Sequence, residues 1–295
     1  MSRAPHLHAV TSVDMATTLH IPPAWEGPLA GFDAELRAAG RPHTTRAMRH
    51  YQLKRFAADH PDTAPGAIVR EDLIAWLGSR TWAPETRRAY RSALTTFYRW
   101  MLATGQVTDD PAAKLPKVVL PRALPRPAPD DALLAGLTTT DERARLAIEI
   151  IDATGLRRGE AAALHTRQLL ETIDGPVLHI TGKGGHERLV PVPSRVASRI
   201  RAAGGFVFPG QIDGHLSAHY LGKLISEALP GKWTAHTLRH RYATRVYRAT
   251  SDLLTLQKLL GHASVRTTEI YVGLSDDRLR GAAETAWELP LPKVA

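Results

Sequence analysis

The chain of 295 residues contains no cysteine, and this absence excludes three kinds of chemistry. It can form no disulfide, hold no zinc through thiolates and use no thiol as a nucleophile. It also has no apolar run approaching the roughly 18 residues that cross a bilayer. The first residues, 1–6, lack the apolar stretch of a secretory signal. These absences predict a cytoplasmic protein with no membrane segment.

Acidic residues are fewer than basic residues in this chain. The 29 Asp and Glu residues are outnumbered by 38 Lys and Arg, which gives a formal net charge of +9. Much of the excess is arginine, whose planar guanidinium suits phosphate. Charge alone leaves open a basic surface without a partner. The length is sufficient for two domains of ordinary size, and the apolar fraction of 43% is typical of a globular protein.

The first part of the chain is predicted to be all-helical. Residues 1–27 show no periodicity and are expected to form a flexible extension. A first domain is predicted over 28–110, and the proline-rich residues 111–128 predict an extended linker. The apolar spacing and the breaks between segments predict helices at 28–40, 44–60, within 68–79 and at 84–104.

Two of these predicted helices carry a basic stripe at helical spacing. One such stripe is often only a solvated face, but two in the same domain favour a surface that faces DNA. The candidate DNA-binding residues are Arg46, Arg49, Lys54, Arg87, Arg88 and Arg91.

The second domain is predicted over 129–275 and is mainly helical with a small antiparallel sheet. Helical patterns begin at 130–137 and 141–153. Two short strands, 177–181 and 187–192, flank a glycine-rich turn, which predicts a β-hairpin. Helical patterns then dominate, and 276–295 predicts a tail helix with an acidic first turn and one apolar stripe.

A tyrosine near the C-terminus suggests nucleophilic chemistry. Tyr271 follows His262 by nine residues, and an upstream cluster places His236 and Arg239 at i and i+3 of a helix. A tyrosine hydroxyl can attack phosphorus, provided that a base takes its proton and fixed positive charge surrounds the phosphate. Both kinds of group are present in these segments.

Five sequence blocks occur in one order, and together they resemble the tyrosine recombinase, or phage integrase, family. They are Thr154-Gly155-Leu156-Arg157 with Glu160, Gly182-Lys183-Gly184, His236-Thr237-Leu238-Arg239-His240, Leu259-Leu260-Gly261-His262, and Thr267-Thr268 with Tyr271. Each block alone is weak, but five in order are specific. The resemblance extends over 28–275. The short stretch before it is typical of the Xer-like architecture, which has no arm-binding domain.

The resemblance implies roles for particular side chains. Arg157 and Arg239 would clamp the scissile phosphate, and Lys183 would protonate the leaving 5′-oxygen. His236 would take the proton of Tyr271. His262 would hydrogen-bond a phosphate oxygen, while Glu160 and His240 would support the site. Arg158 competes with Arg157 for its role, and Glu160 has an alternative role as an ordinary carboxylate at a helix start.

The resemblance also implies the wider function. A helical, SAM-like core-binding domain and a catalytic domain would form a clamp on double-stranded DNA. Cleavage would pass through a 3′-phosphotyrosyl link, and strand exchange through a Holliday junction in a homo-tetramer. No cofactor or metal is expected, and an accessory directionality protein is a candidate partner. The tail helix would dock on a neighbouring subunit, with packing on its own domain as the alternative.

Three other functions compete with this interpretation. A type IB topoisomerase shares the chemistry but usually has lysine at the position of His236. A zinc hydrolase would use His236 and His240, yet Arg239 beside them would repel a dication. A DNA-binding regulator that has lost its catalytic activity is the third alternative. The full set of catalytic residue types in the five blocks argues against it.

Overall fold

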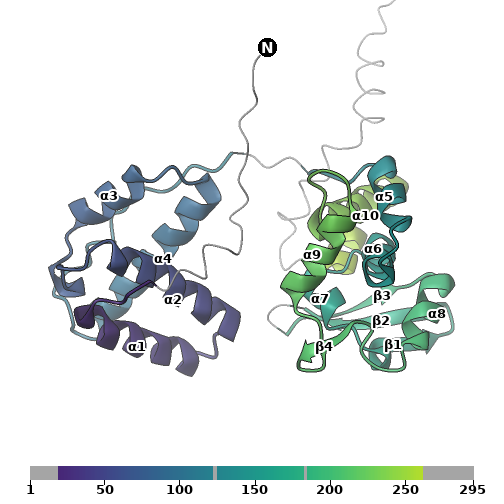
Figure 1. Cartoon of the computed structure of the whole chain (residues 1–295), viewed down its shortest axis with the longest axis horizontal. Helices are drawn as coiled ribbons and strands as arrows, with labels where there is room; N and C mark the ends of the chain where they lie inside the picture. The colour runs from purple at the N-terminus through teal and green to yellow at the C-terminus, as the bar shows by residue number, and fades with distance from the viewer. Residues whose placement is uncertain (1–18, 122–124, 183–184, 262–295) are drawn as a thin grey trace, which may run out of the picture. The chain divides into compact units, whose positions relative to one another are not determined.

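The computed structural model describes residues 19–121, 125–182 and 185–261 (Figure 1). The chain divides into two compact units, residues 1–122 and 123–295. The division lies inside the predicted linker, but both ends of that segment pack into a core. Ala112 and Leu115 are buried in the first unit and Ala128 in the second. None of the described helices is long and apolar enough to cross a membrane.

The first unit is helical over its described residues and has an aromatic core. Trp25, Phe56 and Phe97 are fully buried, and the Trp25 ring stacks on Phe97 at a centroid distance of 5.9 Å. The elements are α1 (Pro23–Ala38), α2 (His43–Ala58), the 3₁₀ turn η2 (Pro65–Ala67), α3 (Arg70–Ser79) and α4 (Pro84–Ala103).

Helix α1 begins earlier than the sequence indicates. The sequence predicts a helix from Pro28 and a flexible extension before it. The helix instead begins at Pro23, and Pro28 lies inside it. Proline there removes one backbone hydrogen bond. The burial of Trp25 and Leu29 on the same helix offsets that loss.

The second unit joins helices to a small antiparallel sheet, as predicted. The sheet has the order β1-β2-β3, and the hairpin pairs Thr181 with Glu187. The elements are α5 (Asp130–Leu137), α6 (Glu142–Thr154), α7 (Arg158–Ala162), η3 (Thr166–Gln168), β1 (Leu169–Thr172), β2 (Gly175–Thr181), β3 (Glu187–Pro191), α8 (Ser194–Ala202), β4 (Pro209–Ile212), α9 (Ala218–Ala228), α10 (Ala235–Thr250) and α11 (Leu253–Leu260).

Two short strands were absent from the predicted elements. Strand β1 is Leu-Leu-Glu-Thr, which has no alternation, and it pairs with β2 through Leu169 and Leu178. Strand β4 begins with Pro209-Gly210 and pairs with His215 across a tight turn. Four residues are too few for a period of two to stand out from the sequence.

The core of this unit lies around α6. Its Ile148, Ile150 and Ile151 are fully buried, and it packs against α5, α9 and α10. Figure 1 shows these helices gathered to one side of the sheet, with α8 beside the strands. The buried face of the sheet consists of Leu178, Ile180 and Val190. This frame supports the predicted site at the ends of α6, α10 and α11.

The end of α6 is shaped by a close approach. Gly155 ends the helix with φ of 64°, in the left-handed region that glycine tolerates. A β-carbon at this position would lie 2.3 Å from Cδ1 of Tyr242 on α10. Only glycine therefore lets α6 and α10 approach so closely. The next residues are Leu156, which is fully buried, and Arg157.

Candidate active site

Arg157 lies at the N-terminus of the short helix α7 and is held on three sides. Its backbone N–H donates to Oε2 of Glu160 at 2.8 Å, and its Nη1 donates to Oε1 at 2.8 Å. Its Nη2 donates to the carbonyl of Gly261 at 3.0 Å. The side chain is still 37% exposed. The guanidinium is thus fixed in direction while one side faces solvent.

Arg239 lies in the second turn of α10 and is only 5% exposed. Its Nη1 donates to the carbonyl of Gly155 at 2.6 Å, and its Nη2 donates to the carbonyl of Leu260 at 2.7 Å. A buried cation requires such polar partners, because its transfer from water is costly. These bonds connect the ends of α6 and α11 through Arg239.

Glu160 is a buried carboxylate between two arginines. It accepts from Arg157 and also from Arg188 on β3, whose Nη1 and Nη2 donate at 3.1 and 2.6 Å. Burial alone would raise the pKa of Glu160, but hydrogen bonds from Arg188 and Arg157 outweigh it and hold the pKa below its usual range. The carboxylate is therefore charged. Glu160 thus binds the guanidinium of Arg157, as an orienting residue would, and also caps the start of α7 by accepting from the backbone N–H of Arg157.

Arg188 is a residue of this site that sequence reasoning missed. The available signal was the alternation of β3: Val190 faces the core, so Arg188, two residues earlier, also faces inward. An arginine on the apolar face of a strand needs a buried partner. That partner, Glu160, is 28 residues away in the sequence, so the strand pattern could not identify it.

His236 and His240 face each other on α10. Their Nε2 atoms are 2.8 Å apart, so one ring donates and the other accepts. Burial lowers the pKa of His236, and the nearby charge of Arg239 lowers it further. His236 is therefore neutral at neutral pH and able to accept a proton. Within the described residues, no group of three or more His, Cys, Asp or Glu side chains is arranged to hold a metal ion.

A cavity of about 660 Å³ brings the predicted groups together. Arg157, Arg239 and His236 all line it, and Arg158 packs against Gly222 of α9. The lining consists of Arg157, Arg158, Gly159, Ala218, Gly222, Ser226, Thr234, Ala235, His236 and Arg239. Both Arg157 and Arg158 thus reach the cavity. Of the two, Arg157 is the one bonded to Glu160 and to the end of α11.

Three predicted catalytic residues, Lys183, His262 and Tyr271, lie outside the described residues, as does the tail at 276–295. The chain segments next to two of them are described. Strand β2 ends at Thr181, close before Lys183, and α11 ends at Gly261, directly before His262.

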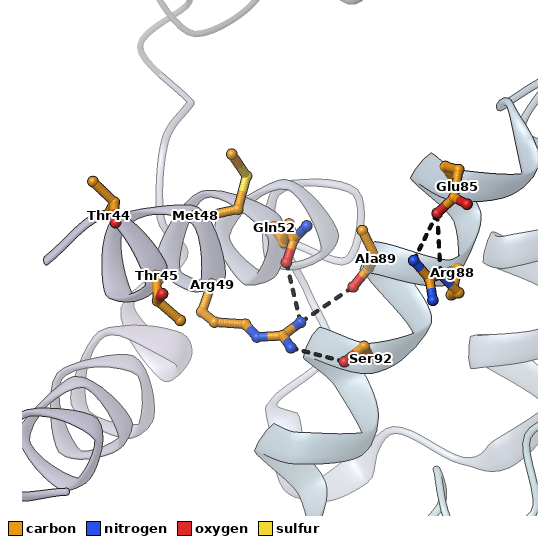
Figure 2. A pocket seen from close by; sticks show the side chains of 9 residues that line it. All are labelled: Thr44, Thr45, Met48, Arg49, Gln52, Glu85, Arg88, Ala89 and Ser92. Carbon is orange, nitrogen blue, oxygen red and sulfur yellow. Dashed lines mark hydrogen bonds and ion pairs between the residues drawn. The ribbon is translucent and has the colours of Figure 1, made fainter. Parts of the chain in front are cut away.

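The predicted DNA-facing arginines of the first unit have intramolecular partners. Arg49 on α2 donates to the Ala89 carbonyl at 3.2 Å and to Oγ of Ser92 at 2.7 Å, both on α4 (Figure 2). Arg88 pairs with Glu85. Arg49 and Arg88 both line a cavity of about 600 Å³ between the two helices. Arg49 thus links α2 to α4.

The other stripe residues make similar contacts. Arg46 pairs with Asp33 of α1 through two hydrogen bonds, which, with help from Arg37, lower the pKa of Asp33 to about 2. Arg87 donates to the Arg80 carbonyl. Arg91 donates to the carbonyls at positions 115 and 116, at 2.8 and 2.7 Å. Lys54 lines a wider apolar groove between α1 and α2. The stripe therefore contributes to packing within the unit.

Comparisons with known proteins agree with the arrangement of the second unit. Residues 130–278 match the model of the phage integrase family. Tyrosine recombinase XerD of Caulobacter vibrioides is 34% identical, over 89% of this chain and 95% of its own length. Tyrosine recombinase XerC of Xanthomonas campestris pv. campestris is 32% identical, over 90% of this chain and 92% of its own.

Solved structures show the same fold. A lambda integrase dimer bound to a COC' core site has a TM-score of 0.69 at 19% identity, covering 93% of this chain and 83% of that one. XerH bound to a palindromic difH substrate has a TM-score of 0.65 at 22% identity, covering 87% and 83%. The protein therefore belongs to the phage integrase family and is a tyrosine-type site-specific recombinase.

Proposed function

We propose that this recombinase cuts duplex DNA with Tyr271 and rejoins it from a 3′-phosphotyrosyl intermediate. The observation that carries the assignment is the cavity on which Arg157, Arg239 and the neutral His236 meet. Two guanidiniums that line one cavity match the charge that a phosphate gathers in its trigonal-bipyramidal transition state. The phosphotyrosyl bond conserves the energy of the cut phosphodiester, so the chemistry needs neither ATP nor a metal.

The two arginines would bind the non-bridging oxygens of the scissile phosphate. The guanidinium of Arg157 is aimed by Glu160, and that of Arg239 by two backbone carbonyls. Each guanidinium presents five N–H donors in a fixed fork, so hydrogens remain after these bonds are made. His262 would add one more hydrogen bond to a phosphate oxygen.

His236 would accept the proton of Tyr271, with His240 as its support. Because the folded protein lowers the pKa of His236, the neutral base persists below the pH at which an ordinary histidine becomes protonated. We expect the rate of single-turnover cleavage to stay constant down to that pH and to fall only at more acidic values. A midpoint at or above the ordinary histidine pKa would argue against His236 as the base.

Lys183 would protonate the leaving 5′-oxygen, since in the sequence it lies between strands β2 and β3, and β3 carries Arg188 beside Glu160. We expect Lys183→Ala to slow cleavage by about 10² to 10⁴. A substrate with a 5′-bridging sulfur should restore the rate, because a thiolate leaves without a proton. The assay is single-turnover cleavage of paired oxygen and sulfur substrates. If sulfur gives no rescue, the general acid is another group.

The substrate is proposed to be a double-stranded recombination site, bound by a homo-tetramer that passes through a Holliday junction. This proposal rests on the family and on neighbours such as a lambda integrase tetramer bound to a Holliday junction, with a TM-score of 0.66. The tail at 276–295 would dock on the next subunit. Truncation after Ser275 should then leave half-site binding but abolish cooperative assembly on native gels.

DNA contacts in the first unit are proposed for its two basic helices. The residues are Arg46, Arg49, Lys54, Arg87, Arg88 and Arg91, whose clustering supports an electrostatic contribution to phosphate binding. A cytoplasmic location and an accessory directionality protein are proposed from the resemblance to the family.

Covalent trapping tests the proposed function directly. The protein is incubated with a pool of duplex fragments in EDTA, denatured, and separated from free DNA, after which the attached strands are sequenced. We expect DNA joined through its 3′-phosphate, with one recurring sequence. If the wild-type protein forms no adduct, the proposed function is wrong. Relaxation of supercoils without strand exchange would identify the topoisomerase alternative.

A further inference from the structure

The end of α11 is bound by three arginines from three different elements. The carbonyls of Leu259, Leu260 and Gly261 are consecutive in the sequence. They accept from Nε of Arg188 at 3.0 Å, Nη2 of Arg239 at 2.7 Å and Nη2 of Arg157 at 3.0 Å. The last carbonyls of a helix have no partner within it and form the negative end of its dipole. Three cations satisfy them here.

Arg188 differs from the other two arginines because it does not line the cavity. Its side chain is only 6% exposed, and its partner Glu160 is 8% exposed. Its side chain makes three hydrogen bonds within the described residues, two to the carboxylate of Glu160 and one to the end of α11. It is therefore placed to act on the site through these partners and not through DNA.

Glu160 carries the effect of Arg188 to Arg157. Its Oε1 accepts from Nη1 of both arginines, at 2.8 Å from Arg157 and 3.1 Å from Arg188. The paired geometry between Arg188 and the carboxylate fixes the plane of that group. Without Arg188, Arg157 alone among the described residues would hold Glu160, and Arg157 is the residue that Glu160 is meant to orient. The carboxylate could then turn, and Arg157 would lose its fixed direction.

The packing at Gly261 shows how closely Arg188 fits. A β-carbon on Gly261 would lie 2.9 Å from Cδ of Arg188, and the residue has φ of 60°. The stem of Arg188 thus packs directly against the residue that ends α11 and precedes His262. Strand β3, which carries Arg188, begins at Glu187, four residues after Lys183 in the sequence.

We propose that Arg188 is a positioning residue for DNA cleavage. It orients Arg157 through Glu160 and fixes the end of α11 through Leu259. Arg157 and the end of α11 therefore keep a fixed position relative to each other. This inference rests on the proposed role of Arg157. It assigns to Arg188 an effect on the rate of the chemical step and none on DNA affinity.

The test measures DNA affinity and the rate of adduct formation separately. The probe is a nicked duplex built on the sequence recovered by covalent trapping with the wild-type protein. We expect Arg188→Met to bind it with unchanged affinity and to form adduct on the order of 100-fold more slowly at saturating protein. Arg188→Lys should be intermediate, since one ammonium cannot satisfy all three acceptors.

Arg199→Met is the matched control. Arg199 on α8 shares Glu149 with Arg195, as Arg188 shares Glu160 with Arg157, but away from the cavity. Its loss should leave both affinity and rate unchanged. Thermal melting sets an assay temperature at which every variant is folded. If Arg188→Met is not folded at a usable assay temperature, the rate and affinity of Arg188→Lys decide the outcome.

A double variant with Glu160→Gln distinguishes positioning from independent effects. Because Arg188 acts in part through Glu160, the loss of rate in Arg188→Met with Glu160→Gln should be smaller than the product of the two single losses, whereas independent effects would multiply in full. Multiplying effects, a wild-type rate in Arg188→Met, or a loss confined to affinity would each overturn the inference. A wild-type protein that forms no adduct would instead overturn the proposed function.

Discussion

Tyr271→Phe is expected to abolish covalent DNA product while leaving DNA binding unchanged. The substitution removes only the hydroxyl, so the nucleophile is lost and the rest of the side chain is retained. Loss of a nucleophile lowers the rate by roughly 10⁴ or more, which places any residual product below detection. Denaturing gels of protein incubated with a nicked site measure the adduct, and native gels measure binding.

Tyr242→Phe provides a matched control within the same unit. Tyr242 packs against Gly155 beside the site, and burial raises the pKa of its hydroxyl above the usual range. A buried phenol of raised pKa is a poor nucleophile, so this variant should form adduct normally. An adduct that persists in Tyr271→Phe and vanishes in Tyr242→Phe would reassign the nucleophile.

Arg239→Lys is expected to reduce cleavage by about 10³, in the range found when a transition-state donor is removed. Arg239 is 5% exposed and spans the carbonyls of Gly155 and Leu260. A lysine ammonium cannot span both acceptors and still face a phosphate, and burial favours its neutral form. Single-turnover cleavage with a saturating nicked site measures the loss.

Arg245→Lys serves as the control for this substitution. Arg245 lies on the same helix, but its side chain is 61% exposed, and its partner Asp152 is also bound by Arg241. Lysine keeps the positive charge beside Asp152, and the geometry of a largely exposed cation contributes little, so cleavage and melting should match the wild type. If Arg239→Lys cleaves as fast as Arg245→Lys, the clamp does not depend on the guanidinium of Arg239.

Local chemistry determined much of what could be predicted. Asp130–Leu137 was identified as a helix, since its apolar spacing and acidic first turn are contained in the segment itself. The β2–β3 hairpin was likewise indicated by two short apolar strands around a glycine-rich turn. The start of α1 was misplaced, because the deciding factor was burial of Trp25 against Phe97. That contact is not local.

The basic stripes show the same difference between what a local pattern predicts and what tertiary packing decides. Spacing on α2 and α4 identified Arg46 and Arg49 as a group on one side of a helix. It did not identify their partners, Asp33 on α1 and the backbone and Ser92 on α4, because those residues are reached only when the helices pack. A stripe predicted from spacing to face DNA therefore also holds the unit together.

By itself, the sequence predicted the chemical groups of the site and their order, because five short blocks each carry their own residue types. Only the tertiary structure decided how those groups are held. Arg157 meets Gly261 at a separation of 104 residues, and Arg188 meets Leu259 at a separation of 71. No local pattern specifies such contacts. They form because buried guanidiniums and the carbonyls at the end of α11 each need a partner once water is excluded.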